Sequence, residues 1–418
     1  MNDFRPNSQN GIAATPEEMN ADTAILARRH APVLLCDSRE PFVPVALGVT
    51  RLAHGSQSPS CRHVPKGPDS CETVLEYAIW WDGDIQHFYE LEHVWVFLDA
   101  AGKPVYAAAS AHGHLKDMGE AEWRDERIVL YCEPGKHAHA ANPADIIVDR
   151  SRLDEACSSG KELRGVMVEE PFKEALAFLT PYDQFLGRQN LRARCFEPSY
   201  CFDKEYDLAP LPVLTWLELA SFIPRFLRNQ TEEFRAAYDG IKAVFLDSGD
   251  TMIDEVTQVF DTQEDELVLS ADPIEGGDKL VAELKARGYL VALVADGREK
   301  SFLNVHEALG FWDLFDAKAI SEVCDSLKPD ARIFREAMFK LGLREEDTSG
   351  IVMVGNNITR DVKGANSLGM NSVWIDWNDR YPREPQDELE QADHVIRKPL
   401  ELLPLLEQME VTMRSGSN

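Results

Sequence analysis

The hydrophobic positions follow two different rhythms, and the change falls near residue 240. Between about residues 26 and 150, short runs of branched and aromatic residues are separated by turn residues, which is typical of β-strands. Such runs cover residues 45–50, 73–81, 93–98 and 105–110. We therefore predict a mainly β module over residues 26–150.

Residues 151–238 follow a helical or irregular pattern. Apolar residues between Trp216 and Leu227 form a broad helical face that Pro224 interrupts. We expect a helical extension of the β module here. The first twenty residues are rich in Asn, Ser, Pro and Glu, and residues 1–25 are predicted to form a flexible tail.

From residue 239 to residue 418, apolar strands alternate with helices. Strands are expected over residues 243–246, 290–294, 351–354 and 372–375, and helices over residues 279–286, 302–309, 331–341 and 361–368. Continuous apolar strands with intervening helices indicate a Rossmann-like α/β domain, in which helices cover both faces of a parallel sheet. Such sheets place their binding sites at the carboxyl ends of the strands.

Composition and charge narrow the class of protein. With 418 residues, 44% hydrophobic and 28% charged, the chain can bury real cores, which excludes wholesale disorder. The net charge of −29 is shared by both halves and argues against a nucleic-acid or anionic-membrane partner. We also expect no membrane span and no signal peptide. Eight cysteines without a C-x-x-C pair are typical of reduced thiols, and we predict a cytoplasmic protein.

Polar motifs follow the first three strands of the α/β domain. They are Asp247-Ser-Gly-Asp-Thr251, Ala295-Asp-Gly297 and Gly355-Asn-Asn357, with Lys328-Pro-Asp330 before the third strand. A carboxylate at the tip of a buried strand, here Asp247, is a positioned nucleophile. Lys328 can neutralise it and an incoming phosphate.

Two further groups of residues complete this predicted site. Loop amides at Ser248, Asp296 and Gly297 are candidates for binding phosphate oxygens. Asn356 and Asp361 offer oxygen ligands for a hard divalent cation. The alternative for Asp361 is that it only caps the following helix.

In order and spacing, these motifs resemble the haloacid dehalogenase-like hydrolases, a superfamily dominated by phosphatases, over about residues 241–410. The resemblance implies a hydrolase that forms an aspartyl-phosphate on Asp247. It also implies that Thr251 orients the loop and that Lys328 balances the charge. Mg²⁺ is then expected near four residues: Asp247, Gly249, Asn356 and Asp361.

Three positions depart from the pattern of the superfamily. Phosphatases carry a second Asp, the general acid and base, where this chain has Gly249, and a missing general acid costs a factor of about 10²–10⁴. Asp250 could replace it if the loop is rearranged. Ala295 replaces a hydroxyl residue, and Asn356 replaces an acid, so we expect weaker binding of Mg²⁺.

The domain is predicted to lack a large cap. About twenty residues separate Asp254 from the helix start at Glu275, and they are expected to form a hairpin over residues 256–260 and 267–270. The segment from Gly297 to Lys328 leaves no room for a large insert either. A capless α/β domain of this family is therefore expected.

Three functions remain open at this point. The leading one is hydrolysis of a small-molecule or macromolecular phosphoester. The first alternative is a scaffold, catalytically weak or inactive, that binds a phosphorylated ligand. The second is 2-haloacid dehalogenase-type hydrolysis, because the dehalogenases of the superfamily also lack the second Asp and need no metal.

Histidine is concentrated in the β module, which holds nine of the eleven histidines between His30 and His139. His87, Glu90, His112 and His137 are candidate ligands of a second metal ion. Imidazole and carboxylate together suit Zn²⁺ or another transition metal. The alternative is that these side chains are hydrogen-bonded polar partners inside a sandwich. The segment faintly resembles the metal-binding strand of the necrosis-inducing toxin-like β-sandwich, although Leu91 stands in place of its Trp.

Overall fold

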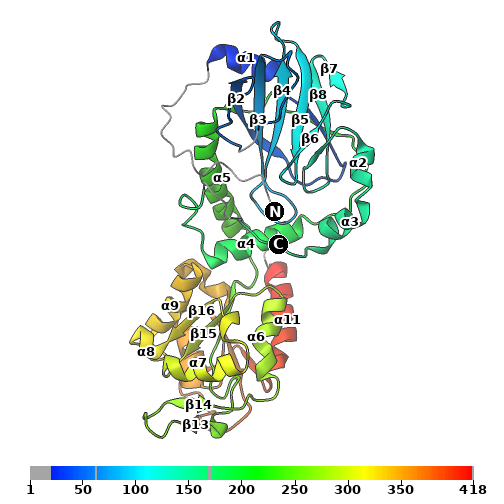
Figure 1. Cartoon of the computed structure of the whole chain (residues 1–418). Coiled ribbons are helices and arrows are strands. Elements are labelled where there is room, and N and C mark those ends of the chain that lie inside the picture. Colours follow the sequence, from blue (N-terminus) through cyan, green and yellow to red (C-terminus); the bar gives the residue numbers. More distant parts are fainter. Residues whose placement is uncertain (1–19, 62–63, 168–171, 417–418) are drawn as a thin grey trace. The chain divides into compact units, whose positions relative to one another are not determined.

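The computed structural model describes residues 20–61, 64–167 and 172–416, with side chains up to residue 413. These residues form two compact units, which are described separately (Figure 1). Unit 1 holds the described residues up to Leu179 and Leu186–Ala236, and unit 2 holds Thr180–Phe185 and the residues from Ala237 onward. Most of the predicted tail lies outside the described residues. Its last part is helical, because helix α1 spans Ala21–Arg29.

Two sheets make up unit 1, which is the mainly β module. One sheet has the order β10-β1-β8-β7, with β9 on β8, and the other has the order β11-β2-β3-β4-β5-β6. The first sheet comprises β1 (Val33–Cys36), β7 (Trp123–Arg124), β8 (Arg127–Cys132), β9 (His139–Ala140) and β10 (Lys204–Asp207). The second comprises β2 (Pro44–Ala53), β3 (Thr73–Trp81), β4 (Leu91–Leu98), β5 (Pro104–Ala111), β6 (His114–Asp117) and β11 (Val213–Leu214).

The second sheet is covered on both faces. Strand β3 is buried from Val74 to Trp81, since alternate side chains meet different neighbours. Trp81 contacts Tyr206 of β10 edge-on, whereas Trp80 contacts Phe226 of helix α5. A strand buried on both faces has a continuous apolar sequence, as this one does.

Helix α5 spans Trp216–Ala237 and continues through Pro224, which was expected to interrupt it. Leu219, Ile223 and Leu227 on its buried face join the core of unit 1. Gly48 on β2 has no side chain, and Leu219 packs into the space that one would fill. A Cβ at position 48 would lie 2.7 Å from Cδ2 of Leu219. The other helices of this segment are α2 (Pro143–Ile147), α3 (Arg150–Ser159) and α4 (Pro181–Ala193).

Unit 2 is built on a six-stranded parallel sheet in the order β16-β15-β12-β17-β18-β19. Its strands are β12 (Ala243–Leu246), β15 (Val291–Ala295), β16 (Ala317–Ile320), β17 (Ile351–Gly355), β18 (Asn371–Ile375) and β19 (His394–Ile396). The Rossmann-like sheet predicted from the sequence is confirmed. Strands β16 and β19 at its two edges were not predicted, because they are short and only partly apolar.

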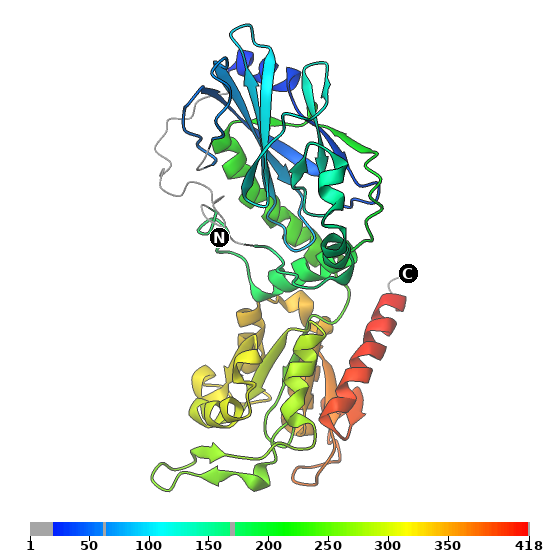
Figure 2. The same cartoon turned by 45° about the vertical axis from the view of Figure 1, so that its right-hand side comes forward.

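Helices pack on both faces of this sheet (Figure 2). They are α6 (Gly277–Ala286), α7 (Glu299–Ala308), α8 (Ser321–Cys324), α9 (Ala331–Leu341), α10 (Lys363–Ser367) and α11 (Leu402–Gly416). Val244 and Leu246 of β12 share a core with Leu280 of α6 and Leu406 of α11. Short helical turns connect the elements: η1 (Glu255–Thr257), η2 (Trp312–Leu314), η3 (Glu345–Gly350), η4 (Ile358–Val362), η5 (Glu388–Glu390) and η6 (Pro399–Glu401).

Residues 247–276, all of them described, connect β12 to α6, and their regular elements are the turn η1 and the hairpin of β13 (Val259–Phe260) and β14 (Val268–Ser270). This agrees with a capless domain. Among residues 20–61, 64–167 and 172–416, no helix combines the length and the apolarity that a bilayer crossing requires.

Candidate active site

The predicted nucleophile lies at the carboxyl end of the central strand of unit 2. Asp247 follows β12, and its backbone N–H donates to the carbonyl oxygen of Val354 on β17, 2.9 Å away. Its side chain lines a cavity of about 270 Å³ together with residues that follow the neighbouring strands. Parallel strands end at the same edge of a sheet, so the separate sequence motifs meet there.

Lys328 lies at the floor of this cavity and is 4% exposed. Its Nζ donates to Asp247 Oδ1 at 2.7 Å, to Asp361 Oδ1 at 2.6 Å and to the carbonyl oxygen of Val294 at 3.0 Å. Burial alone would lower the pKa of Lys328, but the two carboxylates outweigh burial and raise it above its usual range. The ammonium group therefore stays charged and neutralises both acids.

Asp361 is buried beside this lysine, on turn η4. Its second oxygen accepts the backbone N–H of Asn357 at 3.0 Å. Burial raises the pKa of Asp361 to about 7; Lys328 opposes this shift and the charge of Asp247 adds to it. The structure therefore brings Asp247, Lys328 and Asp361 together, as the sequence analysis expected.

Asn356 also faces the cavity, at 7% exposure. Within the described residues, its side-chain Nδ2 is buried without a hydrogen-bond partner. A buried amide in this state requires an explanation. A substrate oxygen that accepts a hydrogen bond from this NH2 group would provide one.

The residues predicted to bind phosphate are placed less simply. The Ser248 hydroxyl is hydrogen-bonded to His306 Nε2 at 2.8 Å, and the Gly297 amide donates to Ser321 Oγ at 2.8 Å. Asp296 accepts the backbone N–H of Lys328 at 2.9 Å. All three residues line the cavity, but the Ser248 hydroxyl and the Gly297 amide already have partners in the protein.

Thr251 and Asp250 have different surroundings. The Thr251 hydroxyl donates to Asp247 Oδ2 at 3.4 Å, which suits a residue that orients the nucleophile. Asp250 is fully buried, forms an ion pair with Arg380 and accepts the backbone N–H of Glu255. It is not among the residues that line the cavity. The expectation that Asp250 could replace the missing acid is therefore not met, because an arginine already holds its carboxylate.

Sequence reasoning missed several residues of the cavity. Glu255, Arg360 and Tyr381 line it. Burial, together with the charges of Asp250 and Asp247, raises the pKa of Glu255 above its usual value. The position of Arg360, next to Asp361, was a signal that could have been used. Tyr381 follows the last predicted strand in a segment without a recognisable pattern.

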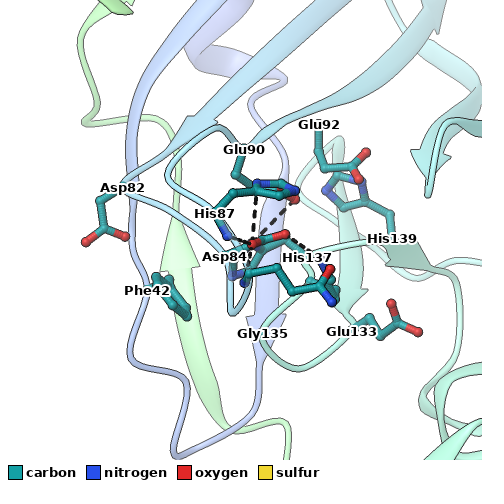
Figure 3. A network of polar contacts seen from close by, with 12 residues as sticks. Phe42, Asp82, Asp84, His87, Glu90, Glu92, Glu133, Gly135, His137 and His139 are labelled. Carbon is teal, nitrogen blue, oxygen red and sulfur yellow. Dashed lines mark hydrogen bonds and ion pairs between the residues drawn. The ribbon is translucent and has the colours of Figure 1, made fainter. Parts of the chain in front are cut away.

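The second candidate metal site lies in unit 1, near the start of β4 (Figure 3). Side-chain atoms of Asp84, His87 and Glu90 lie within 4.8 Å of one another, and all three residues are largely buried. Asp84 already has partners, since its Oδ1 accepts two backbone N–H groups and its Oδ2 pairs with Lys136 Nζ at 2.6 Å.

Of the two remaining predicted ligands, one is near this group. His137 lies 3.6 Å from a carboxylate oxygen of Glu90 and 3.5 Å from one of Glu40, and it stacks on Trp81 at 3.8 Å between ring centroids. Burial would lower the pKa of His137, but the charge of Glu40 and the neighbouring carboxylates raise it to about 10. His112 instead pairs with Glu133 and is half exposed, and it is not part of the group of Asp84, His87 and Glu90.

Comparison with known proteins places the similarity in the second half of the chain. Residues 219–375 match the family model described as haloacid dehalogenase-like hydrolase. A glyceraldehyde 3-phosphate phosphatase of Pyrococcus furiosus is 29% identical over 32% of this chain and 54% of its own length. A phosphoserine phosphatase of Thermus thermophilus is 32% identical over 26% of this chain and 42% of its own length. The chain thus spans about half the length of the curated relatives it matches.

A solved structure is also similar. A HAD phosphatase from Thermococcus onnurineus is 28% identical, with a TM-score of 0.29, over 34% of this chain and 60% of its own.

Proposed function

We propose that this chain hydrolyses phosphoesters through an aspartyl-phosphate on Asp247, since residues 219–375 match the family model of the haloacid dehalogenase-like hydrolases. One observation carries the proposal. Lys328, almost fully buried, holds the carboxylates of Asp247 and Asp361 in an open cavity at the carboxyl ends of the strands.

The residues of the site have separate tasks in this reaction. The Lys328 ammonium group pairs with the carboxylate of Asp247, the nucleophile, at 2.7 Å and balances its charge. An oxygen of Asp247 attacks phosphorus, and the bond from phosphorus to the leaving oxygen breaks. Thr251 orients the attacking carboxylate through its hydroxyl. Water then attacks the phosphorus of the aspartyl-phosphate, which releases inorganic phosphate and restores Asp247.

The charge of the cavity supports a requirement for Mg²⁺. Five carboxylates line it against three cationic side chains, those of Arg298, Lys328 and Arg360. A phosphate dianion would add to this negative charge. Asp247, Asn356, Asp361 and the carbonyl of Gly249 offer oxygen donors of the kind that suits a hard divalent cation. When bound, Mg²⁺ would neutralise charge on the phosphoryl oxygens.

We propose a small phosphoester as the substrate. The names of the similar phosphatases refer to small phosphorylated molecules, and a cavity of about 270 Å³ has the size for a ligand of this kind. A macromolecular phosphoester, exposed enough to enter an uncapped site, is the alternative. All eight cysteines are free thiols, which supports the proposed cytoplasmic location.

Replacement of Asp247 by Asn tests the function. We expect Asp247→Asn to abolish turnover of para-nitrophenyl phosphate, with the fold intact, because the amide has the shape of the carboxylate but is not a nucleophile. Asp278→Asn, an exposed residue of α6, serves as the matched control and should retain the parent rate. Turnover by Asp247→Asn at the parent rate would exclude this nucleophile.

The same assay separates the two alternatives. A scaffold binds phosphate esters without turnover by the parent protein. A dehalogenase releases halide from a 2-haloacid, and chelator does not affect its rate. Loss of para-nitrophenyl phosphate turnover on adding chelator, recovered with Mg²⁺, favours the phosphatase over both.

For unit 1 we propose, as a second hypothesis, a Zn²⁺ site. Its ligands would be Asp84, His87 and Glu90. Their mutual distances favour it, while Lys136 competes for Asp84. Metal analysis of the full chain tests it. Stoichiometric zinc that is lost in His87→Ala supports the site, and a zinc-free parent protein, even after exposure to zinc, contradicts it.

A further inference from the structure

The space beside Gly249 is already occupied by another side chain. A Cβ built at Gly249 would lie 1.9 Å from Oε1 of Glu255, 2.7 Å from its Cδ and 3.0 Å from its Cγ. The Glu255 carboxyl group therefore lies where a side chain at position 249 would begin. Gly249 is not among the residues with positive φ, so its backbone would accept another residue. The carboxyl group of Glu255, not the backbone conformation, occupies the space that a side chain at position 249 would need.

Glu255 is held in this position from several sides. It opens the turn η1, which Asp254 caps by accepting the backbone N–H of Val256 at 2.9 Å. The backbone N–H of Glu255 donates to Asp250 Oδ1 at 3.2 Å. Arg380 lies 3.6 Å from Glu255 Oε2 and also pairs with Asp250. One oxygen of Glu255 thus faces Arg380, and the other faces Gly249.

The same carboxyl group lines the cavity that holds Asp247. Three other acids near the nucleophile have fixed partners, and a fourth, Glu266, lies exposed in the hairpin between β13 and β14. Asp361 is bound by Lys328, and Asp296 accepts the backbone N–H of Lys328 and pairs with Arg360 at 3.3 Å. Asp250 is ion-paired outside the cavity lining. Glu255 is therefore the acid best placed to exchange protons with a substrate on Asp247.

We propose that Glu255 is the general acid and base of the phosphoester hydrolysis, in place of the side chain that Gly249 lacks. This inference rests on the proposed function. In the first step, Asp247 attacks phosphorus, and the Glu255 carboxyl group transfers its proton to the leaving oxygen as its bond to phosphorus breaks. In the second step, the Glu255 carboxylate accepts a proton from water as this water attacks the aspartyl-phosphate. The products are an alcohol and inorganic phosphate, and Glu255 is protonated again.

The need for a proton depends on the leaving group, which supplies the test. kcat/KM reports the steps up to formation of the aspartyl-phosphate, so it isolates the first proton transfer. For Glu255→Gln we expect kcat/KM to fall by about 10²–10⁴ with methyl phosphate, whose leaving group needs protonation. With para-nitrophenyl phosphate, whose phenolate leaves readily, we expect a loss of about tenfold or less.

A matched control removes a charge without removing the proposed proton donor. Glu266 also lines the cavity, from the hairpin side. Glu266→Gln should change kcat/KM for both substrates by the same factor. Equal losses with the two substrates in Glu255→Gln would mean that Glu255 acts only through charge or structure, and would overturn the proposal.

Moving the carboxyl group to position 249 gives a second test. Glu255→Ala empties the space that a side chain at position 249 would need. The double variant Gly249→Asp/Glu255→Ala should then hydrolyse methyl phosphate at least about tenfold faster than Glu255→Ala alone, as restored general acid catalysis implies. A folded double variant that is no faster than Glu255→Ala counts against the proposal.

The phosphatase function and the role of Glu255 can be disproved separately. If Asp247→Asn keeps the turnover of para-nitrophenyl phosphate, or the parent has none, the proposed function fails and this inference fails with it. If Asp247→Asn is inactive while Glu255→Gln loses equally on both substrates, the phosphatase stands and only the role of Glu255 is overturned.

Discussion

Each unit of the chain contains a cluster of acids around a lysine, and the two clusters differ in how the acids are used. In unit 1, Asp84 pairs with Lys136 but also accepts two backbone N–H groups from its own loop. In unit 2, Lys328 holds two acids, and both of them line an open cavity.

This difference separates an acid that its own loop already holds from a nucleophile that is open to a ligand. The loop amides around Asp84 would stabilise its charge even without lysine. Asp247 and Asp361 share a single ammonium group; Asp361 accepts only one further backbone N–H, that of Asn357, and Asp247 remains accessible to a ligand. A group of acids and histidines is therefore a weaker sign of catalytic function than a pair of acids that share one cation at the open end of a sheet.

Loss of the lysine should therefore affect the two units unequally. Lys328→Met leaves two buried carboxylates without their cation, so we expect unit 2 to lose about 3–5 kcal/mol of stability, together with its turnover. Lys136→Met should cost unit 1 about 1–3 kcal/mol, because the loop amides remain. Hydrogen exchange of the amides in β12 and β17, and in β3 and β4, measures the opening of each unit in the full chain.

Equal losses in the two units would contradict the comparison. A larger loss from Lys136→Met would reverse it, and Asp84 would then be the more dependent acid.

The pH dependence of stability should also differ. The pKa of His137 is raised to about 10 in the folded state, above the usual value of about 6.5. Its contribution is fully present below pH about 6.5 and is lost as the pH rises toward 10, so unit 1 should lose about 2 kcal/mol by pH about 8.5. The raised pKa of Glu92 acts in the same direction. Denaturant unfolding, followed by labelling of the five buried cysteines of unit 1, measures this loss.

One group of unit 2, His306, should contribute with the opposite sign, against the raised pKa of Asp361 in the same unit. Burial lowers the pKa of His306 to about 3. Its contribution is present above pH about 6.5 and is lost as the pH falls, by about 2 kcal/mol at pH about 5. The denaturant concentration at which turnover is lost measures the stability of unit 2. His306→Gln keeps a hydrogen-bonding group beside Ser248 and should flatten this acid dependence; an unchanged slope would assign it to other groups.

A smaller effect is expected for the proposed metal site. Asn356 is a neutral ligand, so Asn356→Asp should lower the Mg²⁺ concentration needed for half-maximal turnover, by about tenfold if the added charge contributes about 1.4 kcal/mol. The measurement is turnover against Mg²⁺ after removal of bound metal. Asn357→Asp is the control, since Asn357 lines the same cavity but its Oδ1 already accepts the backbone N–H and the hydroxyl of Thr359. An equal shift in both variants would indicate a general effect of negative charge.

Much of unit 2 could be predicted from the sequence because its signals are local. Apolar strands followed by Asp247, by Asp296 and by Asn356 mark the strand ends, and the parallel sheet then brings them together. Lys328 could be paired with Asp247 for the same reason. The short edge strands β16 and β19 carry no comparable signal.

The position of Glu255 could not be predicted in this way. It reaches Gly249 only because Asp250 and Arg380, more than a hundred residues apart, fix its turn. In unit 1, His112 and His137 had the same sequence signal, but the fold buries only His137 beside Glu90. Side-chain partners that depend on loop geometry are not encoded in spacing.

The central claim is that Asp247 becomes phosphorylated during turnover. Acid quenching of the full chain with para-nitrophenyl phosphate, followed by peptide mass spectrometry, tests it directly. We expect a phosphoryl group on the peptide that contains Asp247, which is absent from Asp247→Asn and accumulates in Glu255→Gln. Turnover by the parent protein without any phosphorylated Asp247, or with the label on another residue, would contradict the account.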